Sequence, residues 1–325
     1  MAVQSTASQI GDTDAVSALA ERLRENVAKC IVGRRAAVDQ LLVAMLASGH
    51  VLIEDLPGTG KTTLCKALAA SLDCRFTRIQ CTPDLVPADV LGVNIFDAQT
   101  REFEFRQGPV FANVVLADEI NRATPRTQSA LLEAMQEGQV SVDGETRKLP
   151  SPFMVAATLN PVEMEGTFPL PEAQLDRFLL RVSVGYPTRE EESEMLDRFR
   201  GSPAPPELDP VATPDDVFAA RRIVQAIRVE APARDYILAL IEATRASDKL
   251  RLGASPRAAL ALQSAAQASA ALDGRGFVVP DDVKHVASAV LAHRIVADST
   301  ATLRGQDTAG IVSEILRSVP VPLDA

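Results

Sequence analysis

The sequence has no tryptophan, and aromatic residues make up only 4% of its 325 residues. Hydrophobic residues still account for 46%, so the core has to be built from Leu, Val, Ile and Ala. Such a composition suits an α/β domain and packed helices. We expect two domains, because one domain contains on the order of 150 residues.

Positive charge is scarce as well. The 33 Lys and Arg residues are outnumbered by 43 Asp and Glu residues, which gives a net charge of −10. Proteins that bind nucleic acids place Lys and Arg on phosphates and stack aromatic rings on bases. With two Tyr and no Trp, this chain offers little of either. We therefore expect no nucleic-acid partner, which counts against a helicase or a loader.

Clustered metal ligands and long apolar runs are also missing. The four cysteines (Cys30, Cys65, Cys74, Cys81) form no CxxC pair and the three histidines are scattered. This pattern predicts reduced thiols, a cytoplasmic location and no zinc site. The longest apolar run, 41–53, is interrupted by Ser48 and His50, so we expect no membrane span. Residues 1–14 are polar, which predicts a disordered or flexible segment and no signal peptide.

Short apolar runs alternate with helical patterns over residues 15–186. Strands covered on both faces by crossover helices have this pattern, so we predict an α/β domain with a five-stranded parallel sheet. The five expected strands are Val51–Glu54, Arg75–Gln80, Asn113–Ala117, Phe153–Thr158 and Phe178–Val182. Two further segments, 92–106 and 139–149, fit β-hairpins inserted into this domain, the second turning at Asp143-Gly144.

The pattern changes after residue 186. Residues 187–212 are predicted to connect two domains, because 201–210 is rich in proline. Residues 213–325 contain no convincing strand and predict a small all-α domain. Two helix starts are marked there by a capping side chain followed by proline, Thr213-Pro214 and Ser255-Pro256.

A glycine-rich turn follows the first expected strand and opens a helical pattern. This strand–turn–helix context is typical of a P-loop, in which backbone N–H groups contact phosphate oxygens. Lys61 would reach the β and γ phosphates of ATP, and the Thr62 hydroxyl would bind Mg²⁺. The strict pattern has glycine where this chain has Asp55, and an ordinary surface turn is the alternative. The expected nucleotide-binding residues are Pro57, Gly58, Thr59, Gly60, Lys61, Thr62 and Thr63.

A carboxylate pair ends the third expected strand. Asp118 and Glu119 follow the apolar run 114–117, at the end of the strand where ligands bind in open parallel sheets. Asp118 would hold Mg²⁺ through water, and Glu119 would polarise the attacking water. Such a pair by itself can be a solvated strand end, but the P-loop upstream favours the catalytic interpretation.

Together with segments 118–123, 128–137, 157–161 and 171–178, these residues closely resemble MoxR-type AAA+ ATPases over nearly the whole chain. The resemblance implies a P-loop AAA+ core followed by a helical lid. It implies that Asn160 is the first sensor, which holds the attacking water, and that Arg177 is the arginine finger for the neighbouring subunit. It also implies that Arg257 is a second sensor for its own subunit's nucleotide.

Each of these residues has a plainer alternative. Asn160 precedes Pro161 and would suit a turn, Arg177 follows Asp176 and could pair with it, and Arg257 opens a well-capped helix. The resemblance further implies that Ile31, Val32 and Gly33 pack on adenine, for which an ordinary turn is the alternative.

The family resemblance implies a chaperone-like motor that forms a ring, by analogy a hexamer. Its hairpins would line or flank a pore, and its client would be a protein, often with a von Willebrand factor A domain partner, in assembly, maturation or metal insertion. The alternatives are a nucleotide-regulated binding scaffold with incidental turnover and a small-molecule P-loop kinase. Glu119 and Arg177 count against the scaffold, because a pure switch needs neither. A kinase has no use for an arginine from a neighbour or for the paired hairpins.

Overall fold

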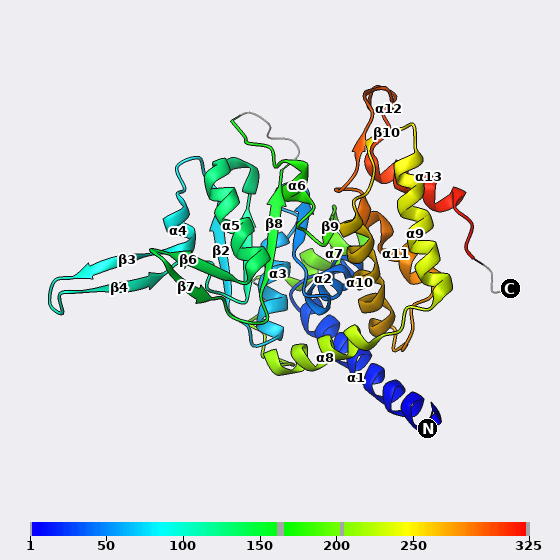
Figure 1. The fold of residues 1–325 in the computed structure, drawn as a ribbon. Helices are drawn as coiled ribbons and strands as arrows, with labels where there is room; N and C mark the ends of the chain where they lie inside the picture. Colours follow the sequence, from blue (N-terminus) through cyan, green and yellow to red (C-terminus); the bar gives the residue numbers. More distant parts are fainter. Residues whose placement is uncertain (1, 161–165, 202–204, 323–325) are drawn as a thin grey trace.

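The computed structural model describes residues 2–160, 166–201 and 205–322, which form an α/β domain and a helical domain (Figure 1). The five strands of the central sheet are all parallel, in the order β2-β5-β8-β1-β9. Their bounds are β1 Val51–Glu54, β2 Phe76–Gln80, β5 Val114–Asp118, β8 Met154–Leu159 and β9 Leu180–Val182. The predicted five-stranded parallel sheet is confirmed, with strand ends shifted by at most two residues.

Alternating side chains of the strands enter two separate cores. Val51 and Ile53 of β1 face the first core, whereas Leu52 faces the second. The first core is built with α1 (Ala2–Ala28), α2 (Arg35–Leu46), α3 (Lys61–Ser71) and the helical domain. The second is built with α4 (Pro87–Leu91), α5 (Pro125–Glu137) and residues around α6 (Glu172–Leu175). Burial on both faces is what a parallel sheet requires.

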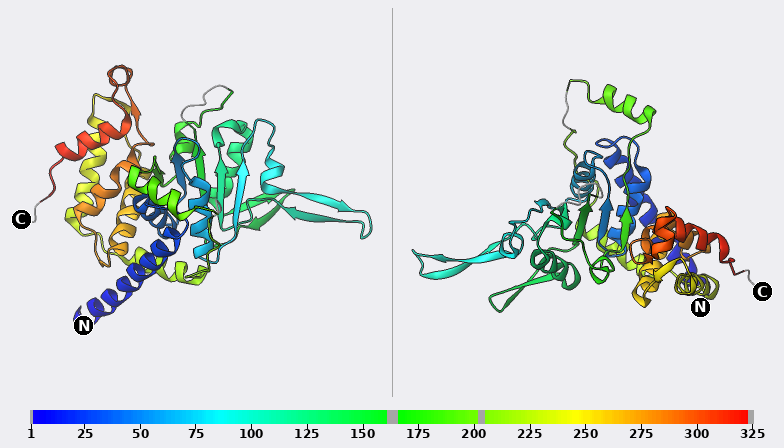
Figure 2. Two further views of the ribbon diagram at one scale, coloured as in Figure 1. Left: turned by 180° about the vertical axis from the view of Figure 1, so that it is seen from behind. Right: turned by 90° about the horizontal axis from the view of Figure 1, so that it is seen from above.

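Two hairpins extend from the α/β domain on the side away from the helical domain (Figures 1 and 2). They are β3 (Gly92–Asp97) with β4 (Glu102–Gln107) and β6 (Gln139–Val142) with β7 (Glu145–Lys148), as predicted. Asn94 Nδ2 donates to Asp143 Oδ2 at 2.7 Å, so the hairpins contact each other. Phe96 and Phe103 pair edge to face on the longer hairpin and are 53% and 73% exposed.

The second domain, called the lid below, contains six helices in the part of the chain that the structure describes: α8 (Pro214–Ala226), α9 (Ala231–Ala246), α10 (Pro256–Leu272), α11 (Pro280–Leu291), α12 (Ser299–Leu303) and α13 (Thr308–Ser318). Thr213 and Ser255 cap α8 and α10 as predicted. The prediction of an all-α domain is wrong in one detail, because β10 (Leu250–Leu252) and β11 (Val296–Ala297) form a small antiparallel sheet. Strands of three and two residues are too short to show a period of two in the sequence.

Two further features concern helices α1 and α7 (Arg189–Arg198). Helix α1 begins at Ala2, so residues 2–14, expected to be disordered or flexible, are helical in the structure. Its later turns bury Val16, Leu19 and Leu23, and extending a packed helix costs less than nucleating one. Helix α7 lies next to the α1–α2 connection, where Arg198 donates to the Ala28 carbonyl, and buries none of its own residues (Figure 2).

Among the described residues, no helix is both long enough and apolar enough to cross a membrane.

Candidate nucleotide site

Three neighbouring strands bring the predicted nucleotide-binding segments together. The glycine-rich loop follows β1, Asn160 follows β8, and Asp118 and Glu119 end β5, while β1, β8 and β5 are adjacent in the sheet. Asp55 N donates to the Leu159 carbonyl at 3.3 Å, which ties the start of the loop to the end of β8. The site therefore lies at the carboxyl end of the sheet, where open α/β sheets bind ligands.

The loop has the backbone shape of a phosphate cradle. Gly58 and Gly60 adopt φ values of 79° and 89°, in the left-handed region that favours glycine. Helix α3 starts directly afterwards at Lys61, so its free N–H groups and positive end face the loop. Lys61 Nζ donates to the carbonyls of Asp55 (3.2 Å) and Leu56 (2.6 Å), and Thr62 and Thr63 lie half-buried in the first turn.

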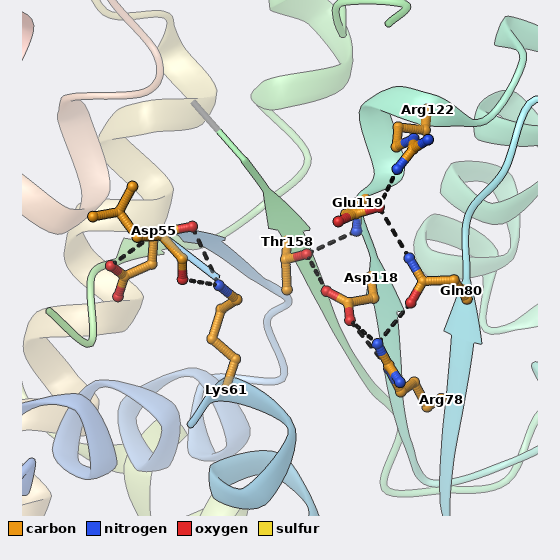
Figure 3. A network of polar contacts seen from close by, with 9 residues as sticks. Asp55, Lys61, Arg78, Gln80, Asp118, Glu119, Arg122 and Thr158 are labelled. Carbon is orange, nitrogen blue, oxygen red and sulfur yellow. Dashed lines mark hydrogen bonds and ion pairs between the residues drawn. The ribbon is translucent and has the colours of Figure 1, made fainter. Parts of the chain in front are cut away.

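Asp55, the departure from the strict P-loop pattern, points away from the cradle (Figure 3). Its Oδ2 accepts from Val184 N and Gly185 N, both at 2.7 Å, and its Oδ1 accepts from Leu56 N at 2.9 Å. The residue is only 8% exposed, and three N–H donors satisfy its charge. Its carboxylate joins the loop to the chain leaving β9 and does not repel phosphate.

Asp118 is held on both of its oxygens (Figure 3). Thr158 Oγ1 donates to Oδ1 at 2.6 Å, and Arg78 donates to Oδ2 through Nε (3.1 Å) and NH2 (2.6 Å). Arg78 stands on β2 directly beside β5, and its NH2 also contacts Gln80 Oε1 at 2.6 Å. The predicted metal-binding carboxylate is thus paired with a cation of its own chain.

Glu119 adopts φ 57° and ψ 50°, a conformation that costs a non-glycine residue about 1 to 3 kcal/mol. Its N–H donates to Thr158 Oγ1 at 2.8 Å, which helps to hold this conformation. Its Oε2 accepts from Gln80 Nε2 at 3.0 Å and from Arg122 NH1 at 3.1 Å. Backbone strain of this kind clusters at functional sites, where it helps to aim a side chain.

The sequence reading missed Arg78, Gln80, Thr158 and Arg122 as members of this site. A signal was available for two of them, because Arg78 and Gln80 are polar residues two apart in a run predicted as a buried strand. Their alternation places both on one face of β2, and that face turns out to be exposed beside the carboxylates.

The remaining predicted residues occupy different surroundings. Asn160 is 7% exposed at the end of β8, while Pro161 of its turn alternative lies outside the described residues. Ile31 and Val32 are buried, and Gly33 lies against Glu191 of α7 so closely that a Cβ would come within 2.0 Å of Glu191 Oε1. The role of Ile31, Val32 and Gly33 in adenine binding stays a prediction.

The two predicted arginines lie at the opposite end of the sheet. Arg177 and Arg257 line a cleft of about 340 Å³, called the amino-end cleft below, together with Ser48, Gly49, His50 and Gln136. Gly49 and His50 immediately precede β1, and the glycine-rich loop immediately follows it. Since four strand residues span about 13 Å, Arg257 lies far from the loop of its own chain. The role of Arg257 as a second sensor stays a prediction, and its position in this structure favours a nucleotide outside its own chain.

The alternative for Arg177, a charge pair with Asp176, is also absent among the described residues. Asp176 accepts from Arg294 Nε at 2.8 Å and from Ser255 Oγ at 3.2 Å instead. The sequence cannot show on which side of the sheet the lid docks, because that depends on contacts between residues over a hundred positions apart.

The residues at the carboxyl end fit a magnesium nucleoside triphosphate. Mg²⁺ is usually held by one or two carboxylates or hydroxyls together with substrate phosphates, not by a full set of protein ligands. Thr62 and Asp118 supply such oxygens, and the described residues contain no group of three or more His, Cys, Asp or Glu placed to hold a metal. The loop, the carboxylate pair and the lid define a P-loop ATPase of the AAA+ class.

Comparisons with known proteins bear this out. Residues 50–180 match the ATPase family associated with various cellular activities (AAA), and residues 242–315 match the AAA lid domain. A solved putative ATPase from Cytophaga hutchinsonii aligns with a TM-score of 0.90 at 36% identity, covering 99% of this chain and 100% of that one.

The similar proteins also define the family. Chaperone MoxR1 of Mycobacterium tuberculosis is 42% identical over 93% of this chain and 82% of its own length. Protein MoxR of Methylorubrum extorquens is 32% identical over 93% and 95%, and the uncharacterised protein YeaC of Bacillus subtilis is 48% identical over 92% and 93%. This chain belongs to the MoxR family of AAA+ ATPases.

Proposed function

We propose that this protein hydrolyses Mg-ATP at sites shared between neighbouring copies of itself in a ring. One observation carries the proposal: the glycine-rich loop and catalytic carboxylates lie at one end of the sheet, whereas Arg177 and Arg257 lie at the other. A single chain cannot bring these groups to one phosphate. Two chains can, if the carboxyl end of one sheet faces the amino-end cleft of the next.

Each side chain has a distinct task in this arrangement. The loop N–H groups and Lys61 bind the phosphates, Glu119 accepts hydrogen bonds from the attacking water, and Asn160 holds that water in line. Arg177 and Arg257 of the neighbouring copy neutralise charge that develops on the γ-phosphoryl oxygens. Mg²⁺ on Thr62 and Asp118 adds further neutralisation when it is bound.

The pairing of the carboxylates predicts how the site becomes active. Arg78 holds Asp118, and Gln80 and Arg122 hold Glu119, so these bonds have to be exchanged when substrate binds. Lys61 likewise has to leave two loop carbonyls for phosphate. We therefore expect an isolated subunit to hydrolyse ATP slowly.

A protein client is the second part of the proposal. MoxR1 of Mycobacterium tuberculosis is named a chaperone. Phe96 and Phe103 form an exposed apolar pair on the projecting hairpin, and exposed apolar surfaces of this kind are often sites of protein contact. We propose a hexameric ring in which the hairpins face the client, with a von Willebrand factor A domain protein as partner, acting in assembly, maturation or metal insertion.

The cytoplasmic location stays a prediction from cysteine usage. All four cysteines are free, and burial together with Asp118 raises the pKa of Cys65 and Cys81 to about 12. Such thiols stay protonated and unreactive at neutral pH.

The decisive experiment measures steady-state ATP hydrolysis against protein concentration for the parent, Glu119→Gln and Arg177→Ala. We expect specific activity to rise with concentration in the parent. Loss of the arginine finger lowers kcat by about 10³-fold or more, and loss of the glutamate by about 10² to 10⁴-fold. Both variants should still bind nucleotide.

Turnover that does not depend on concentration and survives loss of Arg177 would contradict the shared site. A scaffold whose turnover is incidental would keep client binding in Glu119→Gln with no effect of hydrolysis on the client. A motor requires that client remodelling stop in this variant.

A further inference from the structure

A buried arginine of the lid holds the segment that carries Arg177. Arg294 follows α11, is only 7% exposed, and sits 118 positions from Asp176. Its Nε donates to Asp176 Oδ1 at 2.8 Å, NH2 donates to the Phe178 carbonyl at 2.5 Å, and NH1 donates to the Leu179 carbonyl at 2.9 Å. One guanidinium thus binds the residue before Arg177 and the two residues after it.

The charge on Arg294 is retained at neutral pH. Burial lowers its pKa to about 10, while Asp176 acts in the opposite direction. A buried guanidinium is stable only when its donors are satisfied, and here carbonyls and a carboxylate satisfy them. The contact is therefore a specific docking point of the lid and not a chance surface pair.

Asp176 connects the same point to Arg257. Its second oxygen, Oδ2, accepts from Ser255 Oγ at 3.2 Å. Ser255 also caps α10, with Ala258 N donating to its Oγ at 3.3 Å, and Arg257 lies two residues further on. A single carboxylate therefore ties the segment of Arg177 to the start of the helix that carries Arg257.

Arg177 and Arg257 differ from Arg294, which anchors the lid, in the contacts of their side chains. Within the described chain, the structure gives no hydrogen bond or ion pair to the side chain of Arg177 or Arg257. Both line the amino-end cleft together with Arg294, and Asp176 is the one carboxylate among the cleft residues. Arg257 also acts to lower the pKa of Arg294, which places the two positive charges close together. The cleft carries excess positive charge, suited to an anion from outside the chain.

We propose that Asp176 and Arg294 are positioning residues: they fix the segment of Arg177 to the lid, which itself carries Arg257, so that a lid movement in one subunit moves both arginines at its neighbour's phosphate. This inference rests on the proposed shared site. A displacement of about 1 Å in a catalytic group can lower a rate by about 100-fold, so the anchor matters although it touches no substrate.

Three variants test the anchor. Asp176→Asn removes the charge at nearly constant shape, Arg294→Lys keeps the charge but loses the fork of donors, and Ser255→Gly loses the hydroxyl at a small capping cost. We expect kcat to fall by about 10 to 100-fold in the first two and less in the third, with KM unchanged in all three.

Arg251→Met is the matched control. Arg251 also pairs the lid with this part of the α/β domain, donating to Glu172 at 3.3 Å, but both side chains are more than half exposed. An exposed pair contributes little, so we expect kcat to change by less than about twofold.

Mixing experiments separate positioning from general damage. A subunit with Asp176→Asn keeps its own Glu119, and a subunit with Glu119→Gln keeps its own Arg177. An interface is therefore complete where the Asp176→Asn subunit supplies the loop and Glu119 and the Glu119→Gln subunit supplies Arg177. We expect the mixture to exceed the summed activities of the separate proteins. The mixture of Arg177→Ala with Glu119→Gln provides the reference, and thermal melting and nucleotide binding of each variant show whether it is folded.

The outcomes are distinguishable. If the reference mixture gives no recovery, the shared site itself is wrong. If the reference recovers but the folded Asp176→Asn mixture does not, or if folded Asp176→Asn and Ser255→Gly both retain parental kcat, the positioning role is overturned. If Arg294→Lys fails to fold, Asp176→Asn and Ser255→Gly still test the positioning role.

Discussion

The two ends of the central sheet are organised in opposite ways. At the carboxyl end, the reactive side chains are already paired within the chain: Lys61 with loop carbonyls, Asp118 with Arg78, and Glu119 with Gln80 and Arg122. At the amino end, the anchoring groups Asp176 and Arg294 are paired and largely buried, while Arg177 and Arg257 have no partner among the described residues.

In the proposed ring, this difference distinguishes the end of the sheet that binds substrate from the end that contacts the neighbouring subunit. Charges that are paired at rest have to be exchanged by substrate, so the carboxyl end resists unproductive turnover. Unpaired arginines on a well-fixed base need no rearrangement before they meet a phosphate, which is what preorganised charge stabilisation requires. In the proposed ring, two incomplete half-sites in each chain make catalysis depend on assembly.

The strongest test of the comparison replaces one cation at each end. Lys61→Ala should weaken turnover by about 1,000-fold and weaken binding of a fluorescent ATP analogue, because it removes a direct phosphate ligand. Arg257→Ala should leave analogue binding to dilute, monomeric subunits unchanged within about twofold while lowering turnover of assembled protein by about 10-fold. Weaker binding of the analogue to monomeric Arg257→Ala would show that Arg257 contacts the nucleotide of its own subunit.

Acid should lower the stability of the fold through His50, which lines the amino-end cleft. His50 Nε2 lies 2.9 Å from the Met135 carbonyl and its Nδ1 accepts from Val155 N at 3.0 Å, so only the neutral ring satisfies both contacts. Burial lowers its pKa to about 4. The unfolded chain, with a His pKa of about 6.5, binds a proton that the folded chain refuses, so stability is intact above pH 6.5 and falls as the pH drops toward 4.

The expected loss from His50 is about 3 kcal/mol across that window. Urea unfolding of the parent and of His50→Gln at several pH values measures it. The variant starts less stable but should lose less between pH 6.5 and 4. Equal pH slopes in the two proteins would show that His50 does not carry the effect.

Removing the Asp55 carboxylate should cost stability at the carboxyl end without opening the phosphate cradle. Asp55→Ala leaves the N–H groups of Val184 and Gly185 without their acceptor, and we expect a loss of about 2 kcal/mol in urea unfolding. Asp55→Asn keeps an acceptor oxygen and is the matched control, expected to lose less. A loss confined to nucleotide affinity, with stability unchanged, would assign Asp55 to the phosphate site instead.

The smallest effect concerns Arg78, whose side chain is about half exposed. Arg78→Met removes the cation that competes with Mg²⁺ for Asp118, so it should lower the Mg²⁺ concentration needed for half-maximal binding of an ATP analogue. The expected change is about two- to fivefold, because an exposed pair is weak. Arg78→Lys, which keeps the charge, should lie closer to the parent. An unchanged or raised Mg²⁺ requirement in Arg78→Met would mean that the pair does not compete with the metal.

Local sequence signals predicted the sheet and the chemistry of the carboxyl end. The bounds of β1 were predicted without error, the hairpin turn at Asp143-Gly144 was found from its dipeptide, and Thr213 and Ser255 were found from their prolines. Each of these rests on neighbours within a few positions. The central strands are buried on both faces, so their apolar runs are unambiguous.

Contacts between distant positions could not be predicted in this way. The carboxylate of Asp55 binds N–H groups 129 and 130 positions away, and Arg294 binds Asp176 across 118 positions. Both depend on how the chain leaving β9 and the lid pack, which no local pattern records. The side of the sheet on which Arg257 lies depends on the same packing, so no local pattern could place it.

The placement of the loop after β1 and of Gly49 before it gives the proposed ring a direction. Because the donating and receiving surfaces of a subunit are different, every contact is head to tail, and the assembly must close through a rotation or grow as an open helix. A change of nucleotide state in one subunit then reaches its two neighbours by different routes: through the arginines that one neighbour supplies to its phosphates, and through its own Arg177 and Arg257 at the phosphates of the other.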